Sequence, residues 1–301
     1  MNVLSLFDGM SCGQIALNEM GVTVDNYYAS ELDKFAIKES QENWPNMIHL
    51  GDVTKWREWD INWHSIDLLI GGSPCQGFSF AGKQLAFDDP RSALFFVYVD
   101  ILNHIKSVNP QVRFMLENVK MKKEYLQVIT DQLGVEPVFI NSNEIVPQDR
   151  PRHYWFNWDF APVVSLNRDL QHYIDKENKT ENKQGWHTWF ELKKEWRIKK
   201  KYICILNDSE RAITQVARQV ASWAGNIVRV SPGKYRFFSV KEASRLQGAP
   251  DDYFKVSSNT QAYKMLGNGW QIDTIKHIFS TMVEIKREKQ LKLFKADNND
   301  S

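Results

Sequence analysis

The sequence predicts an α/β fold with a mostly parallel sheet and a second, smaller domain. In the first half of the chain, short apolar runs alternate with helical patterns, which is typical of βαβ units. The length of 301 residues is sufficient for one large domain and a smaller one. The distribution of charge marks the smaller domain, because residues 191–245 carry 13 Lys or Arg and only five Asp or Glu in a chain of net charge +1.

The individual elements follow from apolar runs and from the residues that end them. A helix is expected from Gln14 to Met20, where Gly21 ends it, and a second over 91–106, where Asp89 and Pro90 form an N-cap and a first helical position. Short apolar runs predict strands at 3–7, 27–30, 47–50, 67–70, 113–116 and 153–156.

Cys75 stands in the segment GGSPCQGFSF, directly after the predicted strand 67–70. Glycines and Pro74 end this strand, so the thiol is expected at a strand end, where open α/β sheets bind their ligands. A lone cysteine is more often a small buried hydrophobe. Here the neighbours Pro74, Gln76 and Gly77 favour a turn rather than an apolar face, and we interpret Cys75 as a nucleophile.

The three cysteines, Cys12, Cys75 and Cys204, are far apart and form no CxxC pair. This spacing argues against a disulfide framework and against a zinc site, so we expect no metal and a reducing compartment. The N-terminal segment has neither a basic region nor a long apolar stretch, which predicts no signal peptide, no membrane span and a cytoplasmic location.

Three acidic residues, Asp8, Glu31 and Asp52, follow the first three predicted strands. In a parallel sheet they would line the carboxyl edge, beside the crevice in which nucleotides bind. The turn between Phe7 and Gly13 matches neither GxGxxG nor a Walker motif, which favours a cofactor with adenosine but without phosphates. Glu31 is then expected at the ribose hydroxyls and Asp52 at the adenine amino group, although each acid alone could be a helix cap.

Glu117 and two arginines form the remaining candidate site. Glu117 ends the strand that begins at 113, where a partly apolar pocket suits a general acid. Arg150 and Arg152 are two positions apart in an extended segment, so both should lie on one face and bind an anion or a carbonyl. The alternative is a pair of surface charges.

Six sequence blocks together resemble the DNA cytosine-5 methyltransferase family. They occur in family order and leave only 158–235 without a match. The blocks are FDGMSCG at 7–13, SPCQGFS at 73–79, ENV at 117–119, QDRPR at 148–152, RFFSVKEASRLQGAP at 236–250 and LGNGWQ at 266–271.

The resemblance implies a reaction and a role for each matching residue. The Cys75 thiolate would attack C6 of a cytosine, Glu117 would hold its N3 edge, and Arg152 with Arg150 would bind its carbonyl. The methyl group of S-adenosyl-L-methionine would then pass to C5. Because this atom is inaccessible inside a duplex, the base would be flipped out of double-stranded DNA, and residues 76–92 would close over it.

The resemblance also implies a Rossmann-like S-adenosylmethionine-dependent methyltransferase sheet. The residues expected at the cofactor are Phe7, Asp8, Gly9, Met10, Cys12, Gly13, Glu31, Leu32, Asp52, Val53, Pro74, Asn268, Gly269 and Trp270. Four positions depart from many bacterial members, which carry glycines at 11 and 12, often an aromatic residue at 32, and commonly valine or a small residue at 270. In these features the chain is similar to the eukaryotic de novo enzymes and to some phage members.

The expected domains are a catalytic and cofactor-binding domain at 1–157 plus 260–290, a target-recognition domain at 158–259 and a frayed tail at 291–301. The basic stretch 191–245, with Lys199, Lys200 and Lys201, is expected to contact DNA phosphates. Its alternative is a solvated helix face. We expect a monomer, and the resemblance allows for a cognate restriction endonuclease encoded separately.

Two other functions compete with DNA methylation. The related RNA branch of the family typically carries PCQPFT, whereas this chain has Pro74-Cys75-Gln76-Gly77-Phe78-Ser79. A degenerate copy that only binds DNA would usually lack one of Cys75, Glu117 and Arg152, and all three are present. Both observations favour a DNA-modifying enzyme.

Overall fold

The structure is a computed structural model, and it describes residues 1–74, 90–163, 165–166, 168–175, 190–191, 203–218 and 225–282. Its centre is a seven-stranded sheet of order β3-β2-β1-β4-β5-β7-β6. The strands are β1 (Asn2–Leu6), β2 (Asn26–Ser30), β3 (Ile48–His49), β4 (Ile66–Gly71), β5 (Arg113–Val119), β6 (Val138–Asn141) and β7 (Pro151–Phe156).

The pairing of these strands confirms the predicted Rossmann-like sheet. Strands β1 to β5 pair in parallel, and β7 is antiparallel to both of its neighbours, β5 and β6. The carboxyl ends of β1, β4 and β5 therefore meet at one edge. The predicted strand 113–116 is longer than expected and continues to Val119. This extension places Glu117 within β5 rather than after it.

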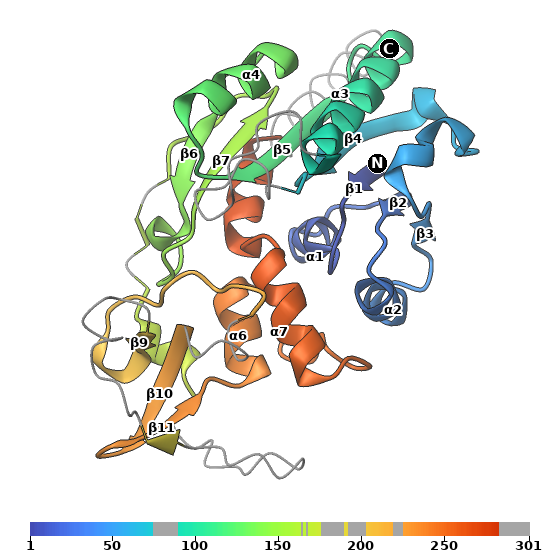
Figure 1. Cartoon of the computed structure of the whole chain (residues 1–301). Coiled ribbons are helices and arrows are strands. Elements are labelled where there is room, and N and C mark those ends of the chain that lie inside the picture. The colour runs from blue at the N-terminus through green and yellow to red at the C-terminus, as the bar shows by residue number, and fades with distance from the viewer. Residues whose placement is uncertain are drawn as a thin grey trace, which may run out of the picture.

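Helices cover both faces of the sheet (Figure 1). Alternate strand residues such as Val3 and Leu4 belong to different apolar clusters, one on each face. On one face lie α1 (Cys12–Glu19) and α2 (Lys34–Asn43), and on the other lie α3 (Pro90–Val108) and α4 (Lys123–Leu133). The two predicted helices correspond to α1 and α3.

Short 3₁₀ helices connect several of these elements. They are η1 (Val53–Glu58), η2 (Trp63–Ser65), η4 (Ser142–Glu144), η5 (Leu170–Tyr173) and η6 (Leu206–Asp208). The side chain of Asp52 caps η1 by accepting a hydrogen bond from the Thr54 amide, as Asp33 does for α2 with the Phe35 amide.

A second sheet of four strands, order β8-β11-β10-β9, lies apart from the first (Figure 1). It consists of β8 (Phe190–Glu191), β9 (Ile203–Ile205), β10 (Gly225–Ser231) and β11 (Lys234–Phe237), with a small apolar cluster of its own. The chain then forms α6 (Val240–Gln247) and α7 (Asn259–Asn268). Ala243 and Leu246 of α6 belong to the same apolar cluster as Val3 of the large sheet. The boundaries at 158 and 259 stay a prediction.

Residues 272–282 form a helix that returns to the large sheet. Ile275, Ile278 and Phe279 are fully buried in the same core as Val3. In addition, Arg113 of β5 donates a hydrogen bond to the backbone carbonyl of Met282. The C-terminal part of the described chain thus packs on the N-terminal sheet.

Several basic residues are paired with acids in the second lobe, the part of the chain that contains β8 to β11 and α6. Arg236 and Glu242 form a buried ion pair of 2.8 Å, Arg229 pairs with Asp208, and Arg245 pairs with Asp251. These pairs reduce the excess charge that is available for a polyanion. The predicted phosphate contacts Lys199, Lys200 and Lys201 lie outside the described residues.

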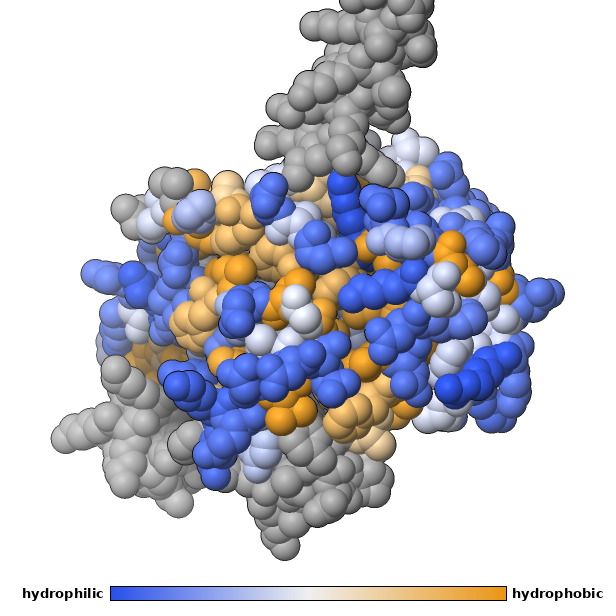
Figure 2. Space-filling view, turned by 90° about the horizontal axis from the view of Figure 1, so that it is seen from above, coloured by the Kyte–Doolittle hydropathy of each residue, from blue (hydrophilic) through white to orange (hydrophobic). Residues whose placement is uncertain are grey.

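Hydrophilic residues cover much of the face shown in Figure 2, and apolar residues gather between them. None of the helices within the described ranges combines the length and the apolar character needed to cross a membrane.

Candidate active site

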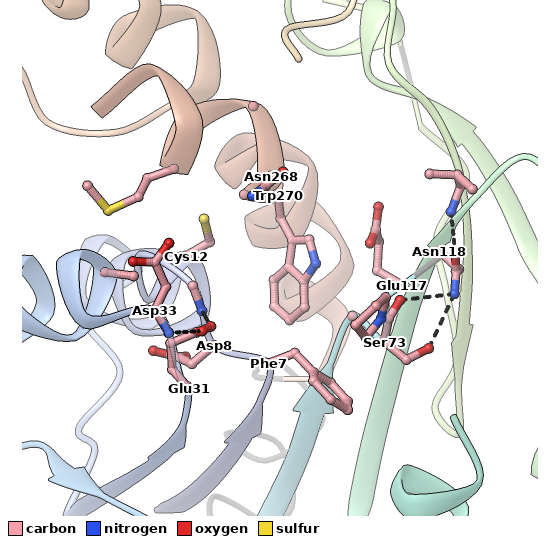
Figure 3. Close-up of a pocket in the computed structure, with 18 of the residues that line it drawn as sticks. Phe7, Asp8, Cys12, Glu31, Asp33, Ser73, Glu117, Asn118, Asn268 and Trp270 are labelled. Carbon is pink, nitrogen blue, oxygen red and sulfur yellow. Dashed lines mark hydrogen bonds between the residues drawn. The ribbon is translucent and has the colours of Figure 1, made fainter. Parts of the chain in front are cut away.

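A cavity of about 330 Å³ opens at the carboxyl edge of the large sheet (Figure 3). This volume lies at the lower end of the range for small-molecule sites. Segments far apart in the sequence line it, among them 7–9 after β1, 72–74 after β4, 117–119 of β5 and 267–270 at the end of α7. The predicted crevice between strand ends is therefore present.

The turn after β1 has an unusual backbone. Phe7 and Ser11 have φ angles of 57° and 56°, in the left-handed region that non-glycine residues seldom occupy. Gly9, with φ of 58°, lies between them. Such conformations cost free energy and persist only where surrounding contacts hold them. Here the Ser11 amide donates to the Asp8 carbonyl at 3.0 Å, and the Gly9 amide donates to Oε2 of Glu31 at 2.7 Å.

Asp8 points beneath this turn and is almost fully buried. Its carboxylate accepts hydrogen bonds from the hydroxyls of Ser11 at 2.5 Å and Tyr27 at 2.8 Å. Burial raises the pKa of Asp8 to about 6, and the hydroxyls, which favour the charged form, offset only part of this effect. Asp8 therefore supports the turn from below.

Glu31 holds the same turn from the other side. Besides the Gly9 amide, its carboxylate accepts hydrogen bonds from the amides of Leu32 and Asp33 at 2.7 and 2.8 Å. The structure thus brings Asp8 and Glu31 together at the cavity. Asp52, the third predicted acid, does not line the cavity and caps η1 instead.

Nine of the fourteen predicted cofactor residues line the cavity, and five do not. The nine are Phe7, Asp8, Gly9, Cys12, Glu31, Pro74, Asn268, Gly269 and Trp270. Of the other five, Met10 and Val53 are buried behind the turn, whereas Leu32 is 69% exposed and faces solvent. Gly13 contributes by its small size, because a Cβ there would lie 2.3 Å from the Ile70 side chain. Asp52 is the fifth.

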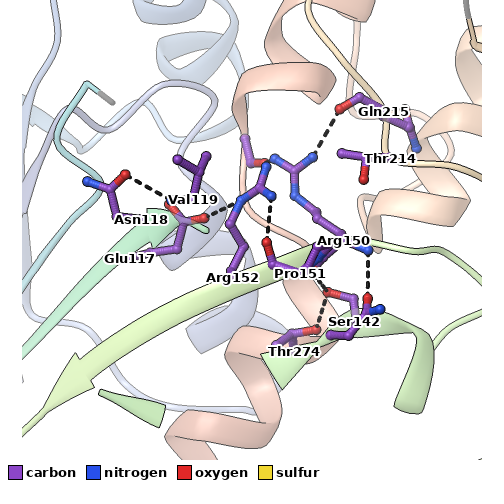
Figure 4. A network of polar contacts seen from close by, with 12 residues as sticks. Glu117, Asn118, Val119, Ser142, Arg150, Pro151, Arg152, Thr214, Gln215 and Thr274 are labelled. Atoms are coloured by element: carbon purple, nitrogen blue, oxygen red, sulfur yellow. Dashed lines mark hydrogen bonds and ion pairs between the residues drawn. The ribbon is translucent and has the colours of Figure 1, made fainter. Parts of the chain in front are cut away.

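Glu117 and Arg152 form an ion pair in the other half of the cavity (Figure 4). Antiparallel pairing of β5 and β7 places Val119 opposite Arg152, so the two charged side chains are diagonal neighbours on one sheet face. Nε of Arg152 lies 2.8 Å from Oε1 of Glu117, and Nη1 donates to the Pro151 carbonyl. In the described part of the chain, no protein group binds Glu117 Oε2 or Arg152 Nη2.

Arg150 has different contacts from those expected. Its guanidinium is buried and donates to the backbone carbonyls of Gln215 at 3.0 Å, Gly267 at 3.2 Å and Gly269 at 2.5 Å (Figure 4). Burial lowers the pKa of Arg150 to about 10. The two arginines were expected to act together on one ligand, but the structure uses Arg150 to join three backbone segments. Both arginines line the cavity, and Nε of Arg150 has no hydrogen-bond partner among the described residues, so their joint action on one ligand stays a prediction.

Trp270 lies between the two halves of the cavity, with Asp8 and Glu31 on one side and Glu117 on the other (Figure 3). Gly72 permits this position, because a Cβ there would lie 2.8 Å from Nε1 of Trp270 and 3.2 Å from Oε2 of Glu117. Glycine at 72 is therefore required by two side chains that are distant in the sequence.

Sequence reasoning missed several residues at the cavity. Lys264 of α7 and Asp33, the residue that caps α2, both line it and form an ion pair of 2.6 Å. Asn118 donates hydrogen bonds to the Ser73 backbone and side chain. The position of Asn118 in the ENV block was a signal for its role. The Asp33–Lys264 pair carries no local signal, because 231 residues separate its members.

The predicted nucleophile, Cys75, lies outside the described residues, and so does most of the predicted closing segment 76–92. The preceding residue, Pro74, lines the cavity. Cys12 and Cys204 are free and buried, and burial raises the pKa of Cys12 to about 12. Neither is a suitable nucleophile at neutral pH. Across the described ranges, no three His, Cys, Asp or Glu side chains are arranged to hold a metal ion.

Solved structures share this fold. A methyltransferase of Entamoeba histolytica, EhMeth, superposes with a TM-score of 0.72 at 15% identity, covering 94% of this chain and 98% of that chain. DNMT2 of Spodoptera frugiperda gives 0.69 at 19% identity, covering 94% and 99%. At such low identity these likenesses concern the fold.

Sequence relatives are more informative about the family. Type II methyltransferase M1.ScrFI of Lactococcus lactis subsp. cremoris is 31% identical over 312 residues, which cover 94% of this chain and 78% of that protein. Type II methyltransferase M.NlaX of Neisseria lactamica is 30% identical over 305 residues, covering 93% and 95%. The family of C-5 cytosine-specific DNA methylases matches residues 1–159 and 157–284. With this match over nearly the whole chain, the protein belongs to the C-5 cytosine-specific DNA methylase family.

Proposed function

We propose that this enzyme methylates C5 of a cytosine flipped out of double-stranded DNA, through a covalent bond between Cys75 and C6 of the base. The observation that carries the proposal is the Glu117–Arg152 pair, which shares one cavity with Pro74, the residue before Cys75. The family match and the relatives named type II methyltransferases support cytosine in DNA as the substrate.

The free atoms of the ion pair suit the polar edge of cytosine. Oε2 of Glu117 is available to share a proton with N3, and Nη2 of Arg152 is available to donate to the O2 carbonyl. Because Arg152 also holds Oε1 of Glu117 at 2.8 Å, a base bound by one residue is oriented by both. Protonation at N3 withdraws electrons from C6 and so favours attack by a thiolate.

The Cys75 sulfur would then bond to C6, and the electron pair of the C5–C6 double bond would make C5 nucleophilic. After methylation, loss of the C5 proton re-forms the double bond and releases the sulfur. The cavity lies below the protein surface, and its polar partners Glu117 and Asn118 are more than nine-tenths buried. A base can reach them only after it leaves the duplex.

The other half of the cavity fits S-adenosyl-L-methionine. Its strained glycine turn brings the backbone close to a ligand, and the carboxylates of Asp8 and Glu31 suit a cationic molecule. When bound, this cofactor supplies an electrophilic methyl group. Phe7, Asp8, Glu31, Pro74, Asn268 and Trp270 would hold it.

The lobe that contains β8 to β11 would recognise the target sequence, since base-edge contacts specify while phosphate contacts position. We propose the boundaries 158–259 for this target-recognition domain and 1–157 plus 260–290 for the catalytic domain. The relatives named type II methyltransferases also suggest a cognate restriction endonuclease as a partner in the cell.

A test of the whole proposal combines a substrate assay with a chemical trap. The purified enzyme with radiolabelled cofactor should label double-stranded DNA but not transfer RNA, and sequencing should place the methyl group on C5 of cytosine. DNA with 5-fluorocytosine at that position has no C5 proton to lose, so it should form an adduct stable to denaturant. Cys75→Ser should form no adduct and should still bind DNA. An adduct with Cys75→Ser, or methylation on nitrogen, would contradict the covalent mechanism.

A further inference from the structure

The charges of the cavity are not balanced between its two halves. Glu117 is paired with Arg152, and Asp33 is paired with Lys264. Among the residues that the structure describes, Asp8 and Glu31 have no cationic partner. Burial lowers the pKa of His49, which interacts electrostatically with Glu31, and so disfavours its charged form. The half of the cavity that would hold the cofactor therefore contains two unpaired carboxylates.

The contacts of the two carboxylates show how they are held without a cation. Glu31 accepts three backbone amide hydrogen bonds, and Asp8 accepts two from hydroxyls. The Ser11 hydroxyl also lies 2.7 Å from the Ser40 hydroxyl, which continues the network away from the cavity. Uncharged donors keep the geometry but leave the negative charge uncompensated in a site of low dielectric.

This arrangement distinguishes the two forms of the cofactor that we assign to the site. S-adenosylmethionine has a sulfonium, an ammonium and a carboxylate, so its net charge is positive. After methyl transfer the sulfur is a neutral thioether, and S-adenosylhomocysteine has no net charge. We propose that the unpaired charges of Asp8 and Glu31 select the sulfonium cofactor over the demethylated product and so favour exchange after each turnover. This inference rests on the proposed function.

The two acids differ in their response to pH. The carboxyl group of Asp8, with a pKa raised to about 6, becomes charged as the pH rises through that value. The groups that face it are Ser5 of β1, Tyr27 of β2, Ser11 and Cys12 around the start of α1, Glu31, and Tyr253 from the segment after α6. Since none of these is a cation, a bound sulfonium is the partner that would favour ionised Asp8. Selectivity for the sulfonium should therefore increase from acid to neutral pH.

The experiment measures the ratio of the dissociation constants of S-adenosylhomocysteine and S-adenosylmethionine by calorimetry on the whole enzyme. The amino acid and adenosine groups are common to both ligands and cancel in this ratio. Between about pH 5 and about pH 8 we expect the wild-type ratio to rise by roughly tenfold, as for one charge acting through a partly buried site. Asp8→Asn should lower the ratio at about pH 8 and remove its change with pH.

Three further variants make the test specific. Tyr27→Phe removes a hydrogen bond that favours charged Asp8, so it should move the midpoint of the pH dependence upward without abolishing it. Glu31→Gln should lower the ratio at both pH values. Asp60→Asn, which removes an exposed carboxylate away from the cavity, should match the wild type.

The outcomes separate this inference from the proposed function. If Asp8→Asn keeps the wild-type ratio and its pH dependence, or if Tyr27→Phe leaves the midpoint unchanged, charge selection by Asp8 is wrong although the enzyme is a methyltransferase. If the wild type binds neither ligand, the proposed cofactor is wrong. Circular dichroism of each variant confirms that it is folded.

Discussion

At the cavity, Asp8 and Glu117 show how neighbouring residues give two carboxylates different properties. Glu117 has a cation at 2.8 Å, whereas Asp8 has only hydroxyl donors and is buried. A buried carboxylate without a cation disfavours its own ionisation. The two residues are thus suited to different tasks, Glu117 to sharing a proton with a base and Asp8 to presenting a charge.

Asp8 should reduce the stability of the ligand-free enzyme at neutral pH. Its pKa of about 6 lies above the value near 3.8 expected when unfolded, so the folded state binds more protons between these values and stability falls as the pH rises from about 4 to about 6. Asp8→Asn should therefore unfold at a higher temperature than the wild type at about pH 8, by an amount equivalent to roughly 1–3 kcal/mol. The gain should shrink at about pH 4. Thermal denaturation of the wild type and of Asp8→Asn measures the gain in stability at each of the two pH values. An equal gain at the two pH values would show that Asp8 does not titrate as described.

The Glu117–Arg152 pair should contribute to the rate and not to protein folding alone. Glu117→Gln and Arg152→Ala should each reduce the rate of methyl transfer by on the order of 100-fold or more, because each acts on charge that develops in the ring. Arg152→Lys is the matched control for Arg152→Ala, since it keeps the positive charge but lacks the planar guanidinium group. Single-turnover kinetics at saturating DNA is the measurement. A variant within a few-fold of the wild type would remove that residue from the catalytic set.

At the scale of elements, Arg150 connects the end of α7, residues 267–270, with the start of β7 and with Gln215. Arg150, before β7, donates to carbonyls at 215, 267 and 269. Gly267 allows this approach, because a Cβ there would lie 2.2 Å from the backbone carbon of Val216. The same segment carries Asn268 and Trp270 into the cavity. The junction between the two lobes is therefore also a wall of the cofactor site.

Loss of Arg150 should weaken this junction and the cofactor site together. Arg150→Met keeps much of the volume but removes the donor to the Gln215 and Gly267 carbonyls and one of two donors to the Gly269 carbonyl, which Gln247 also contacts. This loss should lower the free energy of unfolding by roughly 3 kcal/mol. Affinity for S-adenosylhomocysteine should fall as well, because Arg150 no longer holds the segment 267–270. Urea denaturation and calorimetry measure the two effects. Arg57→Met, at an exposed ion pair with Asp100, should change neither. Unchanged stability in Arg150→Met would contradict the structural role.

At the scale of the whole molecule, charge is distributed unevenly between the two lobes. The stretch 191–245 has an excess of eight positive charges, so the remainder of the chain has an excess of seven negative charges. Ion pairs neutralise part of the basic excess, since Arg229 and Arg236 have acidic partners. The lysines at 199–201 lie outside the described residues and remain predicted phosphate contacts.

The salt dependence of DNA binding tests these lysines. If all three touch phosphate, replacing Lys199, Lys200 and Lys201 with alanine should flatten the slope of log affinity against log salt by up to about 3. Sequence preference should survive, because phosphate contacts carry little sequence information. Lys55→Ala, an exposed lysine outside the basic stretch, serves as the control. A triple variant with the wild-type slope would show that this run is a solvated face.

The sequence by itself determined the fold class, the strand ends and most of the site. Apolar runs and their glycine breaks predicted the strands, and sheet topology then required the residues that follow β1, β4 and β5 to meet at one edge. Glu117 and Arg152 were predicted from their blocks and do form a pair. These features depend on the local order of residues, which can be read directly from the sequence.

Only the tertiary structure decided where individual side chains point. Arg150 and Arg152 are two residues apart and both line the cavity, yet the first donates to three backbone carbonyls and the second pairs with Glu117. Leu32 and Asp52 follow strand ends as expected but do not line the cavity, and the Asp33–Lys264 pair does. The physical reason is that side-chain direction depends on the conformation of each turn and on the elements packed against it. Those partners lie up to 231 residues away, beyond the range of any local pattern.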